Sequence, residues 1–149
     1  MHITKKEDYA LRALLHLAAY GTDTPVMMKE IADIKRIPQP FLAKIMQELS
    51  DVGLVESHRG VKGGFTLKKD PDDITFLDVI QAVDGVLTVN FCFDAHDRCE
   101  IIEDCEMLYV WGGVQRALMK ELRNTSLASV LKYYRTRFSH HAKKISQAS

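Results

Sequence analysis

Three cysteines lie within one short stretch in the middle of the chain, and the sequence contains no others. Cys92 and Cys99 are separated by six residues, and Cys99 and Cys105 by five. Thiolate sulfur is a soft ligand that suits zinc, copper(I) and iron–sulfur clusters. Three thiolates on one loop can hold one face of a metal centre, which leaves at least one ligand position open. The spacing therefore predicts a metal or cluster site whose remaining ligand comes from elsewhere.

The cysteines also have plainer interpretations, as buried thiols or as one disulfide with an odd thiol. The chain begins with the polar stretch MHITKKEDYA and contains no apolar run of membrane-spanning length. These features favour a cytoplasmic protein without a membrane segment, and a reducing compartment favours metal binding or redox work over disulfides. The sequence lacks a Gly-rich phosphate loop, a nucleophile elbow and an HExxH motif, so we do not expect an enzyme.

Charge is distributed unevenly along the 149 residues, although the net charge is zero. Residues 1–70 carry 11 Lys and Arg against 9 Asp and Glu, residues 71–110 carry 1 against 10, and residues 111–149 carry 8 against 1. Overall neutrality argues weakly against indiscriminate nucleic-acid binding. Docking on phosphates requires only a local basic surface, which this distribution permits.

The N-terminal part of the chain has the pattern of a helix-turn-helix. Apolar periodicity predicts helices over residues 7–20, from residue 24 to about 36, and over residues 41–51. The IPQP stretch at residues 37–40 is expected to form the short turn between the second and the third helix. In the second helix we expect an apolar face of Met27, Met28, Ile31 and Ala32. In the third we expect Phe41, Leu42, Ile45, Met46 and Leu49 to face the core.

A hairpin with a cationic tip follows directly, with strands expected over residues 54–58 and 65–67. Glycines permit a tight tip, and Arg59 and Lys62 place two positive charges on it. A hairpin after a helix-turn-helix makes a winged helix, whose tip can reach phosphates or a narrow minor groove. The plainer alternative is a solvated hairpin whose charges aid solubility. Together the two features predict DNA contacts by Gln39, Pro40, Phe41, Lys44, Gln47, Arg59, Gly60, Lys62 and Gly63.

The rest of the chain predicts a fourth helix within residues 71–85, a cysteine loop, a long helix over 106–124, a further helix from 127 and a frayed end over 139–149. The long helix is apolar over much of its surface, so we expect it to pack against the same helix of a second subunit. Packing against the first helix is an alternative, and both can hold. The fold class is thus mainly α, with a winged helix-turn-helix domain and a long C-terminal dimerisation helix. We divide the chain into a DNA-binding domain (1–85), a cluster-binding loop (86–105) and a dimerisation and C-terminal helical part (106–149).

Three stretches resemble the Rrf2 family of bacterial winged-helix iron–sulfur regulators, which includes the IscR, NsrR and RirA types. They are the YALRAL stretch at residues 9–14, the wing with its RGxxGG pattern at residues 57–67, and the cysteine triplet before a long helix that bears Trp111. The resemblance covers about residues 1–135. It implies a homodimeric transcriptional regulator, expected to be a repressor, that binds a pseudo-palindromic operator in double-stranded DNA. It also implies an iron–sulfur cluster on Cys92, Cys99 and Cys105.

The fourth ligand distinguishes the types within this family. The IscR type supplies a His shortly after the third cysteine, and residues 106–109 contain none. The NsrR type, in some members, takes a carboxylate from the first helix of the other subunit, and Asp8 occupies the matching place. The resemblance therefore implies a [4Fe–4S] cluster, favoured over [2Fe–2S], with Asp8 as fourth ligand and nitric oxide as signal. The alternative ligands are His96 and the carboxylates Glu7, Glu100, Glu103, Asp104 and Glu106.

Other functions remain as alternatives at this point. Asp8 also suits the dipole of a helix N-terminus, without any role as a ligand. The six-residue gap after Cys92 resembles the looser RirA-type loops, which favours an iron- or cluster-status sensor. A zinc-stabilised dimer module that does not bind DNA, or an electron-transfer module, would leave the wing without a role. The sequence does not specify the operator, the target genes, the signal, or whether the loaded or the empty form binds DNA.

Overall fold

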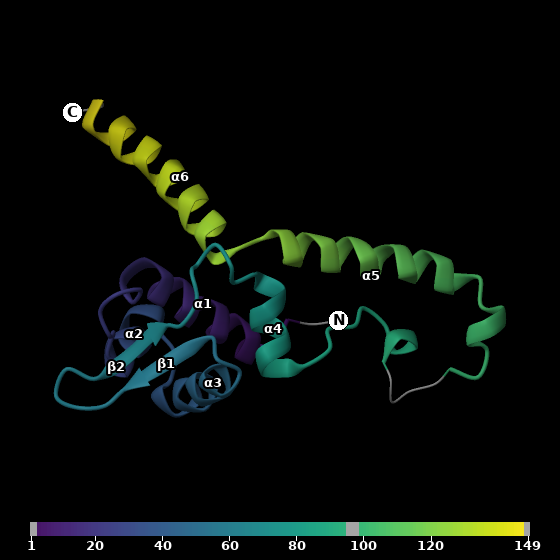
Figure 1. The fold of residues 1–149 in the computed structure, drawn as a ribbon. Helices are drawn as coiled ribbons and strands as arrows, with labels where there is room; N and C mark the ends of the chain where they lie inside the picture. The colour runs from purple at the N-terminus through teal and green to yellow at the C-terminus, as the bar shows by residue number, and fades with distance from the viewer. Residues whose placement is uncertain (1–2, 95–98, 148–149) are drawn as a thin grey trace.

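The computed structural model describes residues 3–94 and 99–147, with side chains described as far as residue 137 (Figure 1). Helices dominate, and the sheet is a single antiparallel pair of strands. The elements are α1 (Lys5–Tyr20), α2 (Met28–Lys35), α3 (Gln39–Asp51), β1 (Val55–His58), β2 (Gly64–Leu67), α4 (Phe76–Asp84), the 3₁₀ turns η1 (Phe91–Phe93) and η2 (Ile102–Asp104), α5 (Met107–Asn124) and α6 (Leu127–Gln147). This confirms the expected fold class, a mainly α winged helix.

Helix α1 is the centre of the N-terminal part, residues 3–85, which we call the head. Its start is set by a capping box, in which the Thr4 side chain accepts from the Glu7 amide and the Glu7 carboxylate accepts from the Thr4 amide. The helix therefore begins at Lys5, two residues before the expected start. Its inner face is fully buried and packs against α2, α3, α4, α6 and β2. The residues of that face with 0% exposure are Ala10, Ala13, Leu14 and Leu17.

Helices α2 and α3 form the helix-turn-helix, with boundaries that differ from the expected ones. Helix α2 begins at Met28 rather than near residue 24, because Val26 pairs with Phe65 through two backbone hydrogen bonds of 3.0 and 2.9 Å. Met27 is consequently exposed, so its predicted place on the apolar face was wrong. Helix α3 begins at Gln39 and includes Pro40 in its first turn, where a missing N–H costs nothing.

Strands β1 and β2 form the wing in the register Val55↔Leu67 to His58↔Gly64. The Val26–Phe65 bridge attaches the wing to the segment before α2. The wing is therefore joined to the helix-turn-helix by backbone pairing as well as by chain connection.

Beyond α4 the chain leaves the head as an extended loop and returns as α5, and we call residues 86–124 the arm (Figure 1). Helix α5 contacts α4, whereas α6 contacts α1. Packing of the long helix against the first helix, which was the alternative to a contact with a second subunit, is thus not the main contact that α5 makes within the chain. Helix α6 continues to Gln147, so a helix occupies residues 139–147 of the segment that the sequence predicts to be frayed. Within the part of the chain described here, none of the helices combines the length and the apolar character that crossing a membrane requires.

Candidate nucleic-acid interface and metal centre

Helix α3 divides its side chains between the core and one open face. Leu42, Ile45, Met46 and Leu49 are buried at 0–1% exposure. The five residues of α3 that are expected to contact DNA are all exposed, namely Gln39, Pro40, Phe41, Lys44 and Gln47. Phe41 is 62% exposed, so its predicted place in the core was wrong. The reason is helical geometry, because one residue before Leu42 corresponds to about 100° of rotation away from the buried face.

The open face of α3 carries groups that suit a major groove. Lys44 supplies a positive charge, and Gln47 supplies an amide whose Nε2 donates to Asp51 Oδ1 at 2.7 Å. An amide can pair with an adenine edge, and an exposed aromatic ring such as Phe41 can contact a thymine methyl group. On the neighbouring α2, hydrogen bonding to Asp33 and its negative charge raise the pKa of Lys29 above its ordinary value of 10.5. Both helices of the motif therefore keep charged amines on their outer surfaces.

The glycines of the wing are required by its backbone. Gly60 has a φ of 112° and its carbonyl accepts the Gly63 amide at 2.9 Å, which closes the tip. A Cβ at Gly63 would lie 2.4 Å from the His58 carbonyl oxygen, and one at Gly64 would lie 2.3 Å from the Val26 carbonyl oxygen. The RGxxGG pattern thus corresponds to a tight tip and, at Gly64, a close approach of the wing to the segment before α2.

The charged residues of the wing project into solvent. Arg59, Gly60 and Lys62 are exposed, and Gly63 is half-buried beneath them. Among the described residues, neither Arg59 nor Lys62 takes part in an ion pair. The wing and α3 therefore present exposed polar and positively charged groups from the same head.

The three cysteines are free thiols, and each is half-buried in the loop between α4 and α5. Cys92 lies in η1, and Cys105 follows directly after η2. Unpaired thiols on one loop are the donor chemistry that an iron–sulfur cluster needs, so the donor set fits such a group. The described residues contain no group of three His, Cys, Asp or Glu gathered closely enough to hold a metal ion. His96, one of the alternative ligands, lies outside the described residues.

The two neighbouring carboxylates at the start of α1 point in different directions. Glu7 is fully buried within its own chain, whereas the side chain of Asp8 is 43% exposed. Asp8 forms an ion pair of 2.6 Å with Arg12, one turn further along α1. Of the two, Asp8 is the one that a second chain can approach.

Sequence reasoning missed one residue that positions the cysteine loop. The Gln115 side chain accepts the Val89 amide and donates to the Leu87 carbonyl, both at 2.8 Å. These two bonds attach the start of the loop to α5. Nothing in the sequence pattern distinguishes Gln115 from a solvated helix residue, because its partners lie 26 and 28 positions away.

The head, with its projecting wing, has the architecture of a winged helix-turn-helix protein. A profile of the Rrf2 family, described as "Iron-dependent Transcriptional regulator", matches residues 3–133. The "HTH-type transcriptional regulator NsrR" of Geobacillus kaustophilus is 32% identical over 132 residues, which cover 88% of this chain and 90% of that protein.

Two solved structures have the same architecture. The structure of CymR, "the Global Cysteine Regulator of B. subtilis", has a TM-score of 0.76 at 28% identity, covering 89% of this chain and 98% of that one. The structure of T. potens IscR has a TM-score of 0.71 at 28% identity, covering 90% and 88%. The chain belongs to the Rrf2 family of transcriptional regulators, which bind DNA and are not enzymes.

Proposed function

We propose that this protein is a homodimeric regulator whose binding to an operator is controlled by an iron–sulfur cluster shared between two chains. The observation that carries the proposal is the exposed carboxylate of Asp8 on the head, in a chain whose free cysteines lie on the arm. A ligand set drawn from both places links the arm of one chain to the head of another. Such a link provides a physical route from the cluster to the geometry of the DNA-binding surfaces.

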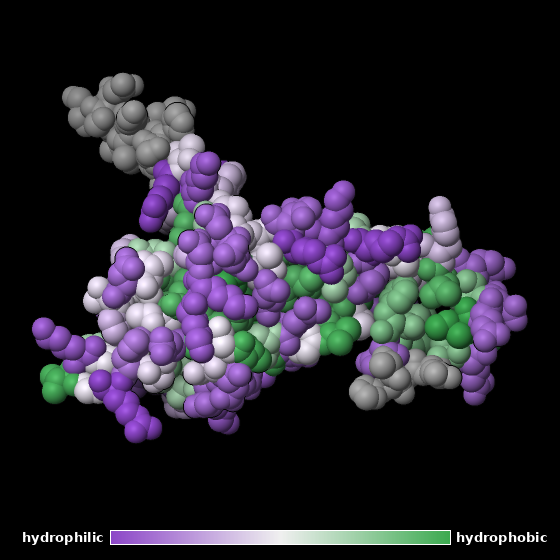
Figure 2. Space-filling model, in the orientation of Figure 1, coloured by the Kyte–Doolittle hydropathy of each residue, from purple (hydrophilic) through white to green (hydrophobic). Residues whose placement is uncertain are grey.

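The exposed apolar side chains of α5 support a homodimer. Met107, Val110 and Val114 are 50%, 50% and 45% exposed, and Tyr109 is 84% exposed. Figure 2 shows apolar side chains exposed at the end of the molecule where α5 begins and the loop folds back. A second copy of α5 would cover this face under two-fold symmetry. Two heads related by that symmetry suit a pseudo-palindromic operator, with α3 in the major groove and the Arg59 wing in the minor groove.

In this proposal Cys92, Cys99 and Cys105 of one chain hold the cluster together with Asp8 of the second chain. A bound [4Fe–4S] cluster supplies an iron site that reacts with nitric oxide, or that responds to iron or redox status. Asp8 and Arg12 neutralise each other in the single chain, so ligation by Asp8 leaves Arg12 without its partner. The division into residues 1–85, 86–105 and 106–149 then corresponds to DNA binding, cluster binding and dimerisation. The description of the family as iron-dependent supports iron as an alternative signal to nitric oxide.

The Asp8 ligand is tested with the variant Asp8→Ala and the matched control Asp23→Ala, which removes an exposed carboxylate elsewhere on the head. The proteins are purified without oxygen and compared by visible absorption and Mössbauer spectroscopy, before and after stepwise addition of nitric oxide. We expect Asp8→Ala to lose or change the signal of one iron site while Asp23→Ala matches the wild type. An unchanged spectrum in Asp8→Ala would exclude Asp8 as a ligand. A colourless wild-type protein that contains zinc would contradict the proposal of an iron–sulfur cluster.

The wing contact is tested with Arg59→Ala, using a duplex selected from a random library by the wild-type protein. Loss of one phosphate or groove contact should weaken binding about tenfold and reduce the salt slope by about one. Lys69→Ala, an exposed cation after β2, serves as the control and should change both quantities less. Wild-type affinity in Arg59→Ala would show that the wing does not contact DNA.

A further inference from the structure

Glu7 is a buried carboxylate with one oxygen left unpaired. Its exposure is 0%. Oε2 accepts the Thr4 amide at 2.5 Å and completes the capping box. Oε1 has no hydrogen-bond partner among the described residues. Removing an ionised carboxylate from water is costly unless a compensating group is present, so this oxygen indicates a binding partner.

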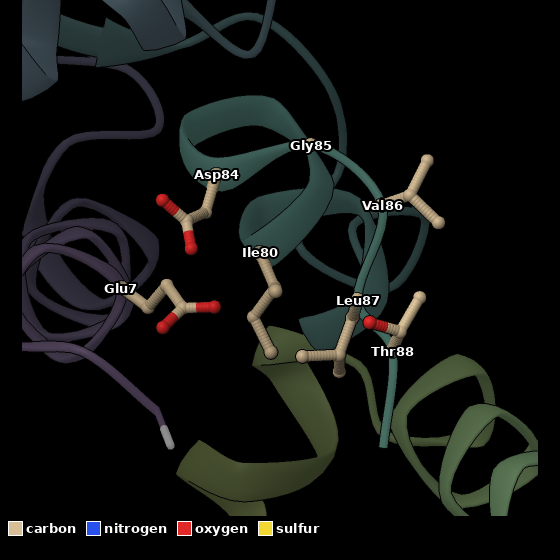
Figure 3. A pocket seen from close by; sticks show the side chains of 7 residues that line it. All are labelled: Glu7, Ile80, Asp84, Gly85, Val86, Leu87 and Thr88. Carbon is tan, nitrogen blue, oxygen red and sulfur yellow. The ribbon is translucent and has the colours of Figure 1, made fainter. Parts of the chain in front are cut away.

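The Glu7 side chain points into a small cavity at the end of α4. The cavity has a volume of about 150 Å³ and is lined by Glu7, Ile80, Asp84 and residues 85–88. Figure 3 shows the Glu7 side chain, from α1, and the Asp84 side chain, from the end of α4, on the same side of this cavity, with the Asp84 carboxylate directed toward Glu7. The volume is well above the minimum that one water molecule needs, so an ion with several waters has room there.

Several sources of negative potential converge on this cavity. Asp84 is the last residue of α4, and the final carbonyl groups of a helix carry partial negative charge. Gly85 follows with a φ of 79°, which turns the backbone so that residues 85–88 line the cavity. Two carboxylates therefore line one cavity beside the C-terminus of α4, and this arrangement favours a cation.

The neighbouring cation in the sequence, Lys6, lies at the C-terminus of α4 but forms an ion pair with neither Glu7 nor Asp84 among the described residues. Lys6 Nζ donates to the Val83 carbonyl and pairs with Glu48 at 2.8 Å. Within the part of the chain that the structure describes, no Lys, Arg or His forms an ion pair with Glu7 or Asp84. The protein's own described side chains thus leave the two carboxylates without an ion-pair partner.

We propose that Glu7 and Asp84 bind a hydrated divalent cation of the oxygen-preferring kind, Mg²⁺ or Mn²⁺. Such ions bind through one or two carboxylates and retain several waters, which matches the two carboxylates and the size of the cavity. The ion joins the first turn of α1 to the point where the chain leaves α4 for the cysteine loop. The site includes neither a cysteine nor Asp8, so it shares no residue with the ligand set proposed above for the cluster.

The test measures binding of Mn²⁺ by the loss of its free six-line EPR signal, using the tag-free full chain. Wild type is compared with Glu7→Gln, Asp84→Asn and the control Glu56→Gln, which removes an exposed carboxylate from β1. Glutamine can replace glutamate in a capping box, so Glu7→Gln should fold, and Asp84→Asn alters only an exposed side chain. We expect one tight site per chain, at least tenfold weaker in Glu7→Gln, several-fold weaker in Asp84→Asn, unchanged in Glu56→Gln, and competed by Mg²⁺.

Equal binding by wild type and Glu7→Gln would overturn the proposal, because the ions would then be distributed over the acidic surface of residues 71–110. Absence of binding at millimolar Mn²⁺ would also overturn it, since water alone would then fill the cavity. Neither outcome depends on cluster loading or DNA affinity, so failure here is distinguishable from failure of the proposed function.

Discussion

The head and the arm differ sharply in how they bury their apolar side chains. In the head, the inner faces of α1 and α3 are almost fully buried. In the described residues of the arm, only Leu87 and Gly112 are buried, and several apolar residues of α5 are about half exposed or more. One chain therefore completes the core of the head by itself, whereas the arm leaves apolar side chains exposed to solvent. This contrast is the reason that we place the proposed dimer contact on the arm.

The largest effect is expected in the core of the head. Leu42→Ala removes a side chain of 0% exposure and leaves a cavity, so it should lower the free energy of unfolding by about 2–5 kcal/mol. Leu118→Ala makes the same change on α5, where the side chain is half-buried, and should cost less. Urea unfolding of both variants measures the difference. Equal losses would contradict the contrast between head and arm.

A change of association rather than of folding is expected in the arm. Val110→Asp places a charge on the proposed contact face of α5 and should weaken dimerisation at least 100-fold, which is about 2.7 kcal/mol. Val61→Asp is the matched control, because Val61 is 99% exposed at the tip of the wing. Sedimentation velocity at several concentrations measures the dimer, and circular dichroism checks the fold. A Val110→Asp protein that remains dimeric at low micromolar concentration would place the dimer contact elsewhere.

The smallest effect concerns the junction between the two regions. Gln115→Ala removes both hydrogen bonds to the start of the cysteine loop, each with a net value of about 1 kcal/mol. The Val89 amide should therefore exchange its hydrogen faster while the amides of α1 keep their protection. Gln81→Ala, at an exposed position of α4, is the control and should leave Val89 unchanged. Unaltered exchange at Val89 in Gln115→Ala would show that other contacts hold the loop.

Local patterns predicted most of the fold of the head. The starts of α1 and α4 are local features, because the capping boxes of Thr4 with Glu7 and of Thr75 with Asp78 each need only residues three positions apart. The apolar stripes of α1 and α3 and the glycines of the wing are local in the same sense. Helix boundaries were less predictable, as the start of α2 shows. That start depends on the pairing of Val26 with Phe65, a contact between residues far apart in the sequence.

The candidate site was predictable in its chemistry but not in its geometry. The sequence pointed to the wing cations and the three thiols, and the structure places Arg59 and Lys62 in solvent and the cysteines in one loop. The sequence could not show that Glu7 is buried and Asp8 exposed, because the burial of adjacent helix residues depends on what packs against each of them.

The sequence by itself determined the residue types, their helical and strand periodicity, the caps, and the glycines that the wing requires. These properties depend on interactions among near neighbours, and near neighbours are visible in any sequence. The tertiary structure decided that Phe41 is exposed, that Glu7 points into a cavity beside Asp84, and that Gln115 holds the loop. Each of these outcomes depends on segments that meet only after folding, because burial and hydrogen bonding are set by the groups that surround a side chain in space.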